Sequence, residues 1–302
     1  MCGDFSSSTY LESAESGYEF VRKHNTTFAN DGRENIVDDY CALCAATELY
    51  KATGKQYYKV ESDRFASSLV SRLHTNQDHS DYWRADDTDR PFFHAADAGL
   101  PLVSLLSYLE IADQERRAAV IETVRKSLEF ELRITEHVTN PFGYARQYVQ
   151  NIEGERRDSF FFPHRTETKS WWQGENARLG SLAAAARLAA PHFRDDPAFQ
   201  KKLHAYARNQ LNWILGLNPF DVCMLSGSGR NNPFYMFFGS YQYVPSPGGI
   251  CNGITASQKN EHDIDFNLTW EETGEDNDWR WVEQWLPHSS WFLVAVSAMN
   301  LE

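Results

Sequence analysis

The sequence is poor in cysteine and in basic residues, and it has no long apolar run. Its 5 cysteines are an odd number and lie too far apart for a disulfide framework. No segment approaches the roughly 20 consecutive apolar residues of a membrane-spanning helix. The opening MCGDFSSSTYLESAESG also lacks the basic and apolar regions of a signal peptide. These absences predict a cytoplasmic protein without disulfides, provided that the sequence begins at its native residue.

Two of the cysteines, Cys41 and Cys44, form a C-x-x-C pattern within DDYCALCAATELY. A zinc site would need a second pair at a suitable spacing, and the sequence contains none. The flanking residues follow a helical pattern. We therefore interpret both side chains as buried thiols rather than as a redox or metal site.

The 29 basic residues are outnumbered by 42 acidic ones, which gives a formal net charge of −13. This charge argues against a general affinity for nucleic-acid phosphates or anionic membranes, and it favours a neutral or cationic substrate. Aromatic residues make up 14% of the chain. They could form the stacking surfaces with which enzymes hold sugars, or they could fill a large core.

Most long segments repeat apolar residues at helical spacing, and few alternate as strands do. The fold class is therefore mainly α, and we expect one domain over residues 1–302. The segments SLAAAARLAA and SSWFLVAVSAM are apolar almost all round, which is typical of the inner helices of a two-layer helical barrel. The predicted helices cover about residues 10–24, 36–53, 59–74, 95–111, 114–137, 171–190, 196–216 and 287–301.

Four segments resemble, in the same order, motifs of the catalytic module of glycoside hydrolase family 9. ENIVDDYCALCAATELYKATGKQYY is similar to that family's DELAWAAAWLYRATGD helix, and ARNQLNWILGLNPFDVCMLSGSGRNNPF is similar to its QIDYILGDNP segment. SPGGICNGI and DNDWRWVEQWLPHSSWFLVAV stand in the places of its GALVGGP and DDRxDYVxNEVAxDYNAGFVGAL motifs. The resemblance implies the C-terminal portion of an (α/α)6 barrel that lacks its N-terminal helices.

The resemblance also implies a catalytic acid at the start of the last barrel helix. Glu283 holds that position, because Pro287 and an apolar run follow it. Glu261 lies in a superficially similar NEHDIDF segment, but no barrel helix follows it. We interpret Glu261, Asp263 and Asp265 as a solvated or loop-organising acidic cluster, with a calcium site as the alternative and no other cofactor expected.

A general acid for glycosidic cleavage must stay protonated near neutral pH, and apolar walls favour the protonated form. Trp281 and Trp285 could supply such walls for Glu283. If residues 279–285 are extended, their two-residue period places these three side chains and Trp279 on one side. The alternative is a surface glutamate beside core tryptophans.

A second group of candidates lies in SFFFPHRTETKSWWQGENARLGSLAAAA. We expect Ser170 to cap a helix whose first turn presents aromatic rings and hydrogen-bonding groups at the mouth of the barrel. The alternative is a set of core tryptophans with Glu175 paired to Arg178. The substrate-binding candidates are Trp171, Trp172, Glu175, His164, Arg165, Arg230, Trp281 and Trp285.

Hydrolysis with inversion needs a second carboxylate that activates water. The resemblance places this base in an Asp pair before the helix at 36–53, where this sequence has no such pattern. DDTD at 86–89 and HAADAG at 94–99 both come after that helix. We therefore expect the isolated chain to lack the base and to have little activity. Its exposed barrel surface is expected to bind a missing N-terminal segment or to cause self-association.

The resemblance implies an inverting β-glycoside hydrolase for short β-linked, gluco-configured oligosaccharides. The segments WWQGENARL and WRWVEQWLPHSSW resemble most the exo-acting branch of the family, which releases glucosamine or glucose. Glu175 or Glu167 could contact the glucosamine ammonium. An endo-β-1,4-glucanase is the alternative, although Arg230 follows SGSG where that family has His-His-Arg. Two further classes stay open: a non-catalytic carbohydrate-binding protein, and a sugar epimerase that uses His164 or His288.

Overall fold

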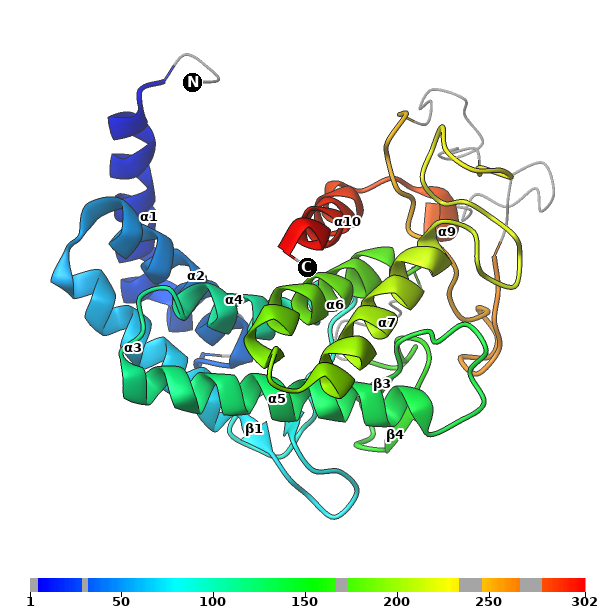
Figure 1. Ribbon diagram of the computed structural model, residues 1–302, viewed down its shortest axis with the longest axis horizontal. Helices are drawn as coiled ribbons and strands as arrows, with labels where there is room; N and C mark the ends of the chain where they lie inside the picture. The colour runs from blue at the N-terminus through cyan, green and yellow to red at the C-terminus, as the bar shows by residue number, and fades with distance from the viewer. Residues whose placement is uncertain (1–4, 29–31, 167–172, 234–245, 267–278, 302) are drawn as a thin grey trace. The chain divides into compact units, whose positions relative to one another are not determined.

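The computed structural model describes residues 5–28, 32–166, 173–233, 246–266 and 279–301 (Figure 1). Helices make up most of these residues, and the strands form two short antiparallel hairpins. The α-helices are α1 (Ser7–Phe28), α2 (Ile36–Thr53), α3 (Gln56–Ser71), α4 (Leu100–Tyr108), α5 (Gln114–Glu136), α6 (Asn176–Ala189), α7 (Pro197–Ile214), α9 (Trp279–Val282) and α10 (Leu286–Ser297). The strands are β1 (Leu73–His74), β2 (Tyr82–Trp83), β3 (Gln147–Gln150) and β4 (Arg156–Ser159), and 3-10 turns cover Ala190–Phe193 and Ala298–Leu301.

The mainly α fold and the positions of the predicted helices are confirmed, with two shifted starts. The helix expected from residue 95 begins at Leu100, because Nδ1 of His94 accepts the N–H groups of Ala96 and Asp97 in a turn. The helix expected from residue 171 begins at Asn176. Glu175 holds the N-cap position of α6, and Ser170, the cap that we expected, lies outside the described residues.

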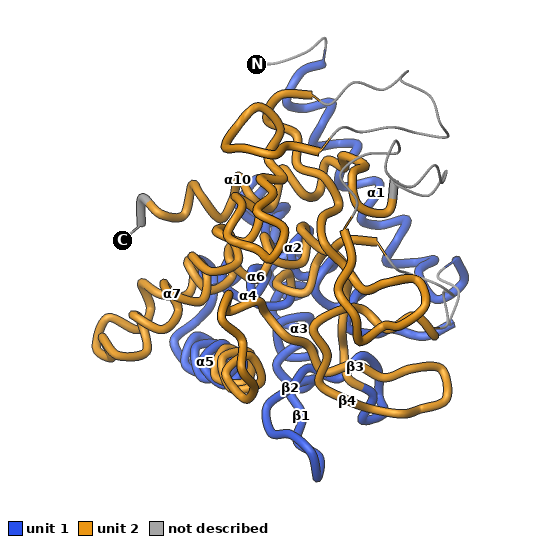
Figure 2. Tube along the Cα trace, turned by 90° about the vertical axis from the view of Figure 1, so that its right-hand side faces the viewer, with its two compact units in different colours: residues 1–90, 101–127 blue, residues 91–100, 128–302 orange. Residues whose placement is uncertain are grey.

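The chain divides into two compact units, which Figure 2 shows in different colours. The first unit comprises residues 1–90 and 101–127, and it contains α1 to α4. In α2, Asn35 and Asp38 form a reciprocal capping box, and Gly54 ends the helix in the left-handed region at φ 66°. Tyr18 of α1 packs on α2 and α3 in a small apolar cluster.

The second unit comprises residues 91–100 and 128–302, and α6 lies at its centre. Nearly every residue of α6 is buried, and the helix packs against both α7 and α10. Near the start of α6, a Cβ on Gly180 would lie 2.9 Å from Cβ of Trp291. Near its end, Nη1 of Arg187 donates to the carbonyl of Ala295 at 2.7 Å. The later residue of α6 contacts the later residue of α10. The two helices therefore run in the same direction and begin at the same end of the unit.

The interpretation of Cys41 as a buried thiol is wrong, because Cys41 is exposed on α2. Cys44 is half-buried, and burial raises the pKa of its thiol to about 12. Among the described residues, no group of three or more His, Cys, Asp or Glu side chains could hold a metal ion. Within the same ranges, no helix combines the length and apolar character that a membrane span requires.

Candidate active site

Glu283 lies in the short connection between α9 and α10, and backbone hydrogen bonds fix it on both sides. The carbonyl of Glu283 accepts the N–H of Asn252 at 2.8 Å. Before it, the carbonyl of Trp281 accepts the N–H of Gly253 at 2.7 Å. After it, Gln284 forms an isolated antiparallel bridge with Cys251. Residues 251–253 therefore hold the backbone around Glu283 in place.

The same loop is also fastened to the start of α6. The N–H of Asn176 donates to the carbonyl of Asn252 at 3.1 Å, and its Nδ2 donates to the carbonyl of Cys251 at 2.8 Å. The N–H of Gly174 donates to the carbonyl of Arg280 at 3.0 Å. The first turn of α6, the loop and the connection that carries Glu283 therefore meet at the shared starting end of α6 and α10.

Close backbone contact at this junction requires a glycine. A Cβ on Gly174 would lie 2.2 Å from the carbonyl oxygen of Gly253 and 2.3 Å from that of Asn252. No side chain can occupy that space without moving one of the two backbones. Gly253 itself adopts φ 99°, a backbone conformation that residues other than glycine rarely adopt.

The tryptophans around Glu283 are placed differently from our expectation. Residues 279–282 form the helical turn α9, so the two-residue period of an extended strand does not apply. Trp281 is buried. The guanidinium of the neighbouring Arg280 lies over the Trp281 ring, and its Nη2 donates to the carbonyl of Ala256. Trp285 is partly exposed, and Glu283 is half-buried between them in sequence. The segment thus has one buried and one accessible tryptophan, two residues before and two residues after Glu283.

His288, in the first turn of α10, is a buried and uncharged group. Its Nε2 lies 2.8 Å from Oδ1 of Asn252, and its ring stacks on that of Trp285 with centroids 6.2 Å apart. Burial lowers the pKa of His288 to about 3. The imidazole is therefore neutral near physiological pH, which suits a positioning role better than the proton transfer of a sugar epimerase.

The structure corrects the role of Glu175, which we expected to contact substrate. Its side chain has no exposed surface and forms an ion pair with Arg178. One carboxylate oxygen accepts the N–H of Phe162 at 2.6 Å, and the other accepts Nε2 of Gln147 at 3.0 Å. Both oxygens therefore bond to groups inside the protein. This matches the alternative interpretation, in which Glu175 pairs with Arg178. Trp171 and Trp172 lie outside the described residues.

The other basic candidates have protein partners. Arg165 is largely exposed and pairs with Glu153. Arg230 is also largely exposed, and its Nη2 lies 2.8 Å from Oδ1 of Asp221. His164 is half-buried, and burial lowers its pKa although the Glu261 carboxylate opposes this shift. As substrate contacts, these three remain proposals.

Both carboxylate oxygens of Glu261 bond to other protein groups, so this residue organises a loop. Its Oε1 pairs with Nη2 of Arg157 at 2.5 Å, and its Oε2 accepts the backbone N–H of His164 at 2.7 Å. Nearby, Thr255 and Asp265 form an isolated antiparallel bridge. These contacts agree with our interpretation of this acidic segment as loop-organising.

Asp97, in the HAADAG segment that we set aside as a source of the base, lies beside α10. Oδ1 of Asp97 accepts the indole N–H of Trp291 at 2.8 Å, and the N–H of Gly99 donates to Oγ of Ser181 on α6 at 3.0 Å. A Cβ on Gly99 would lie 2.1 Å from the carbonyl oxygen of Ser181. The HAADAG segment therefore lies against both helices that begin at the site. In the sequence, the small residues around Asp97 were the sign of this contact, since small side chains allow the HAADAG segment to approach α6 closely.

Solved structures with a related fold are about twice as long as this chain. The Bacteroides ovatus GH9 structure has 15% sequence identity and a TM-score of 0.57, and the match covers 95% of this chain and 47% of that one. Endoglucanase CelQ from Clostridium thermocellum, complexed with cellobiose and cellotriose, has 15% identity and a TM-score of 0.52, with 97% and 44% covered. The catalytic domain of Clostridium thermocellum CelT has 15% identity and a TM-score of 0.51, with 87% and 48% covered. The shared fold is that of the (α/α)6 barrel, of which this chain spans about half.

No curated protein matches this chain in sequence. The model of the family described as glycosyl hydrolase family 9 matches residues 4–247, which is most of the chain. This match includes α1 to α7 and extends to residue 247. The chain therefore belongs to glycosyl hydrolase family 9.

Proposed function

We propose that this chain carries the general acid of an inverting β-glycoside hydrolase. The observation that carries the proposal is the position of Glu283. It is half-buried, it lies three residues before α10, and its backbone is fixed by Asn252 at the shared start of α6 and α10. Membership of family 9 supports this reaction class.

In this mechanism, Glu283 donates its proton to the oxygen that bridges two sugars. A second carboxylate deprotonates the water that attacks from the opposite face of the ring. In inverting enzymes the two carboxyl groups lie about 6.5–9.5 Å apart, which leaves room for that water. We propose that the base comes from outside these 302 residues. The proposal is supported by the length of the chain, which covers 44–48% of the similar structures.

The proposed substrates are short β-linked, gluco-configured oligosaccharides that are cleaved from a glucosamine or glucose end. The sugars bound to CelQ support the gluco configuration, and a net charge of −13 would attract a glucosamine ammonium. Glu175 is too deeply buried to contact that ammonium. Glu167, the other candidate for this contact, lies outside the described residues.

Two alternatives follow from specific observations. Endo-β-1,4-glucanase action is favoured by the similarity to CelQ, and the sizes of the first products from a long cello-oligosaccharide would identify it. Non-catalytic carbohydrate binding is favoured by the short span of the chain relative to its neighbours. In that case the chain would bind oligosaccharides, but it would not cleave them even when it is combined with the rest of a family 9 catalytic domain.

The decisive experiment compares Glu283→Gln with Glu261→Gln in a chain combined with the rest of a family 9 catalytic domain. We expect Glu283→Gln to lower kcat about 10²–10⁴-fold on oligosaccharides, the usual contribution of a general acid, and to spare sugar binding. On dinitrophenyl glycosides the loss should be much smaller, because that leaving group needs no proton. Glu261→Gln should leave kcat on both substrates nearly unchanged. Equal losses on both substrates for Glu283→Gln would refute its role as the acid.

A further inference from the structure

The second unit contains a small polar pocket between the end of α5 and the middle of α7, with a volume of about 380 Å³. The last turn of α5 and residues 138–143 form one side, and a face of α7 from Lys202 to Asn209 forms the other. We call this feature the α5–α7 pocket. It shares no residue with the connection that carries Glu283.

Hydrogen bonds hold the turn after α5 in place without a ligand. Nδ2 of Asn140 donates to the carbonyls of Thr135 at 3.3 Å and Tyr144 at 2.8 Å, and Oδ1 of Asn140 accepts the N–H of Tyr144 at 3.1 Å. From α7, Nε2 of Gln210 donates to the carbonyl of Gly143 at 2.8 Å. The pocket is therefore pre-formed, so a ligand would not have to order its walls.

A missing side chain makes room in this pocket for the amide of Asn209. Gly143 adopts φ 61°, and a Cβ there would lie 2.2 Å from Nδ2 of Asn209. The amide is half-buried, and no hydrogen bond joins it to another residue in the described part of the chain. Its oxygen and its NH₂ group are therefore both left for a ligand, one as acceptor and one as donor.

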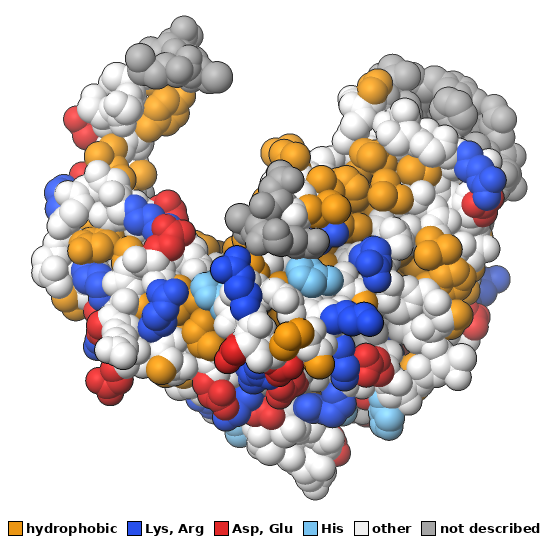
Figure 3. Space-filling model, viewed as in Figure 1, with side chains coloured by type: hydrophobic (Ala, Val, Ile, Leu, Met, Phe, Trp, Pro, Cys, Tyr) orange, Lys and Arg blue, Asp and Glu red, His pale blue; other side chains and the backbone are white. Residues whose placement is uncertain are grey.

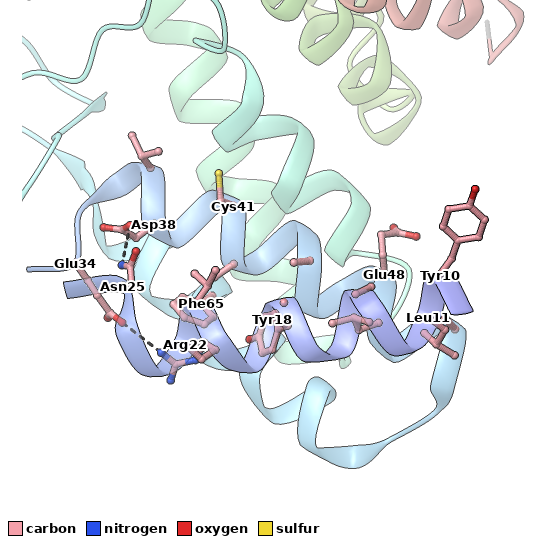
Figure 4. Close-up of a pocket in the computed structure, with 18 residues that line it drawn as sticks. Tyr10, Leu11, Tyr18, Arg22, Asn25, Glu34, Asp38, Cys41, Glu48 and Phe65 are labelled. Atoms are coloured by element: carbon pink, nitrogen blue, oxygen red, sulfur yellow. Dashed lines mark hydrogen bonds and ion pairs between the residues drawn. The ribbon is translucent and has the colours of Figure 1, made fainter. Parts of the chain in front are cut away.

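A larger cavity of about 710 Å³ lies between α1 and α2 in the first unit, but its charged groups already have protein partners (Figure 4). The pairs are Arg22 with Glu34, Asn25 with Asp38, and Lys51 with Glu48. The α5–α7 pocket differs because it combines a pre-formed cavity with an unbonded amide.

The charges at the mouth of the α5–α7 pocket favour a neutral ligand. Glu136 lies on the α5 side and Lys202 on the α7 side, and both are exposed. Neither has a hydrogen bond or ion pair with the described residues. One charge of each sign gives no net charge, and Figure 3 shows acidic and basic side chains mixed over the surface of α5 and α7. Charge complementarity therefore prefers neither a cation nor an anion.

The buried hydroxyl groups of the lining already have partners. The hydroxyl of Tyr206 donates to Oε2 of Glu131 at 3.4 Å, and Oγ1 of Thr135 accepts the N–H of Arg146 at 3.2 Å. The uncharged amide of Asn209 is thus the polar group that the half-buried part of the pocket presents.

This arrangement suits a sugar better than a zwitterion. A zwitterion would find its charge partners, Glu136 and Lys202, in contact with water, where an ion pair contributes little. The amide can instead bond two adjacent hydroxyl groups of a sugar, one through its oxygen and one through its NH₂ group. Val138 and Pro141 add exposed apolar surface against which the C–H groups of a sugar ring can pack.

We propose that the α5–α7 pocket binds a neutral sugar of one or two rings through the amide of Asn209. Its volume of about 380 Å³ lies at the small end of the range of ligand pockets, about 300–1,000 Å³, which suits a ligand of this size. The site is separate from Glu283 and needs no catalytic group. Only the choice of a β-linked glucose disaccharide as the probe rests on the proposed function.

The test measures how cellobiose affects the acetylation of single lysines by N-hydroxysuccinimide acetate, followed by mass spectrometry. At about four times its Kd, cellobiose should slow the acetylation of Lys202 about fivefold, because about one fifth of the pockets remain empty. Lys201 is exposed and does not line the pocket, so its rate should not change. Glycylglycine, a zwitterion, should not protect Lys202 at the same concentration. Turnover plays no part in this measurement, so its outcome is independent of the role of Glu283.

Three variants locate the binding site. Asn209→Leu removes both amide groups at similar size and should weaken cellobiose binding at least about tenfold. Ala205→Phe fills the pocket without removing a polar group and should also abolish the protection of Lys202. Asn212→Leu changes another half-buried asparagine of α7 that does not line the pocket, and the protection should persist.

The proposal is overturned if cellobiose slows the acetylation of Lys201 and Lys202 equally, or slows neither. It is also overturned if glycylglycine protects Lys202 as well as cellobiose does, or if Asn209→Leu or Ala205→Phe keeps the protection of the original chain.

Discussion

Asn252 donates its backbone N–H to the carbonyl of Glu283 at 2.8 Å, and its side-chain Oδ1 lies 2.8 Å from Nε2 of His288. One residue thus fixes both the proposed acid and the first turn of α10. Its carbonyl also accepts the N–H of Asn176 at the start of α6. The position of Glu283 therefore depends on this loop, which lies about thirty residues earlier in the chain.

The buried His288 should make the stability of the protein depend on pH. In the unfolded chain His288 takes up a proton near its ordinary pKa of about 6.5, whereas burial lowers its folded pKa to about 3. Between these values the unfolded state binds more protons, so the free energy of unfolding should fall as the pH falls. Urea titrations at several pH values should show this loss in the original chain and a weaker loss in His288→Gln. The same change at the exposed His262 is the matched control, and an equal reduction of the loss there would show that the effect does not come from the buried imidazole.

Gly174→Ala should destabilise the junction that carries Glu283. The added Cβ would lie 2.2–2.4 Å from backbone atoms of residues 252 and 253, which must move to make room. Forced overpacking of this kind typically costs about 1–3 kcal/mol. Gly17→Ala in α1 is the matched control, because its Cβ would meet nothing within 4 Å. There we expect a gain of about 0.5–1 kcal/mol, and equal effects of the two changes would contradict the packing described here.

Glu175→Gln should act on stability rather than on substrate affinity. The change leaves Arg178 buried without its charge partner, and breaking a buried pair in this way costs about 3–5 kcal/mol. Glu153→Gln breaks the exposed pair with Arg165 and should cost less than about 1 kcal/mol. Chemical denaturation of both variants measures the difference. If Glu175→Gln left stability unchanged but weakened oligosaccharide binding, our original expectation for Glu175 would be restored.

The helices could be predicted from sequence where local signals define them. The bounds of α2 follow from Asn35, Asp38 and Gly54, which cap the helix without help from distant residues. The start of α6 could not be predicted in the same way. It is set by hydrogen bonds from Gly174 and Asn176 to segments about eighty to one hundred residues away, and propensity contains no information about such partners.

Site residues were predictable only in part, for a similar reason. The resemblance to a family motif selected Glu283, because that motif records a position in the chain. It could not show that Glu175 points inward, since the same WWQGEN pattern suits an accessible helix mouth and a buried ion pair equally well. HAADAG, which contains Asp97, was set aside because it follows the helix at 36–53, and the sequence could not show its contact with Trp291, which joins residues 194 positions apart.

Glu131→Gln should stabilise the protein increasingly as the pH rises from about 4 to about 7. Burial raises the pKa of Glu131 to about 7, although Arg178 and a hydrogen bond from Tyr206 oppose the shift. Between its ordinary pKa of about 4.3 and pH 7, the folded state holds the proton more tightly, so the free energy of unfolding falls as the pH rises. Glutamine removes this loss because it does not ionise. We therefore expect a higher Tm than the original chain at about pH 8 and a similar Tm at about pH 4, whereas Glu129→Gln, which changes an exposed residue of α5, should change neither. A gain of the same size at both pH values would show that the effect comes from packing and not from the ionisation of Glu131.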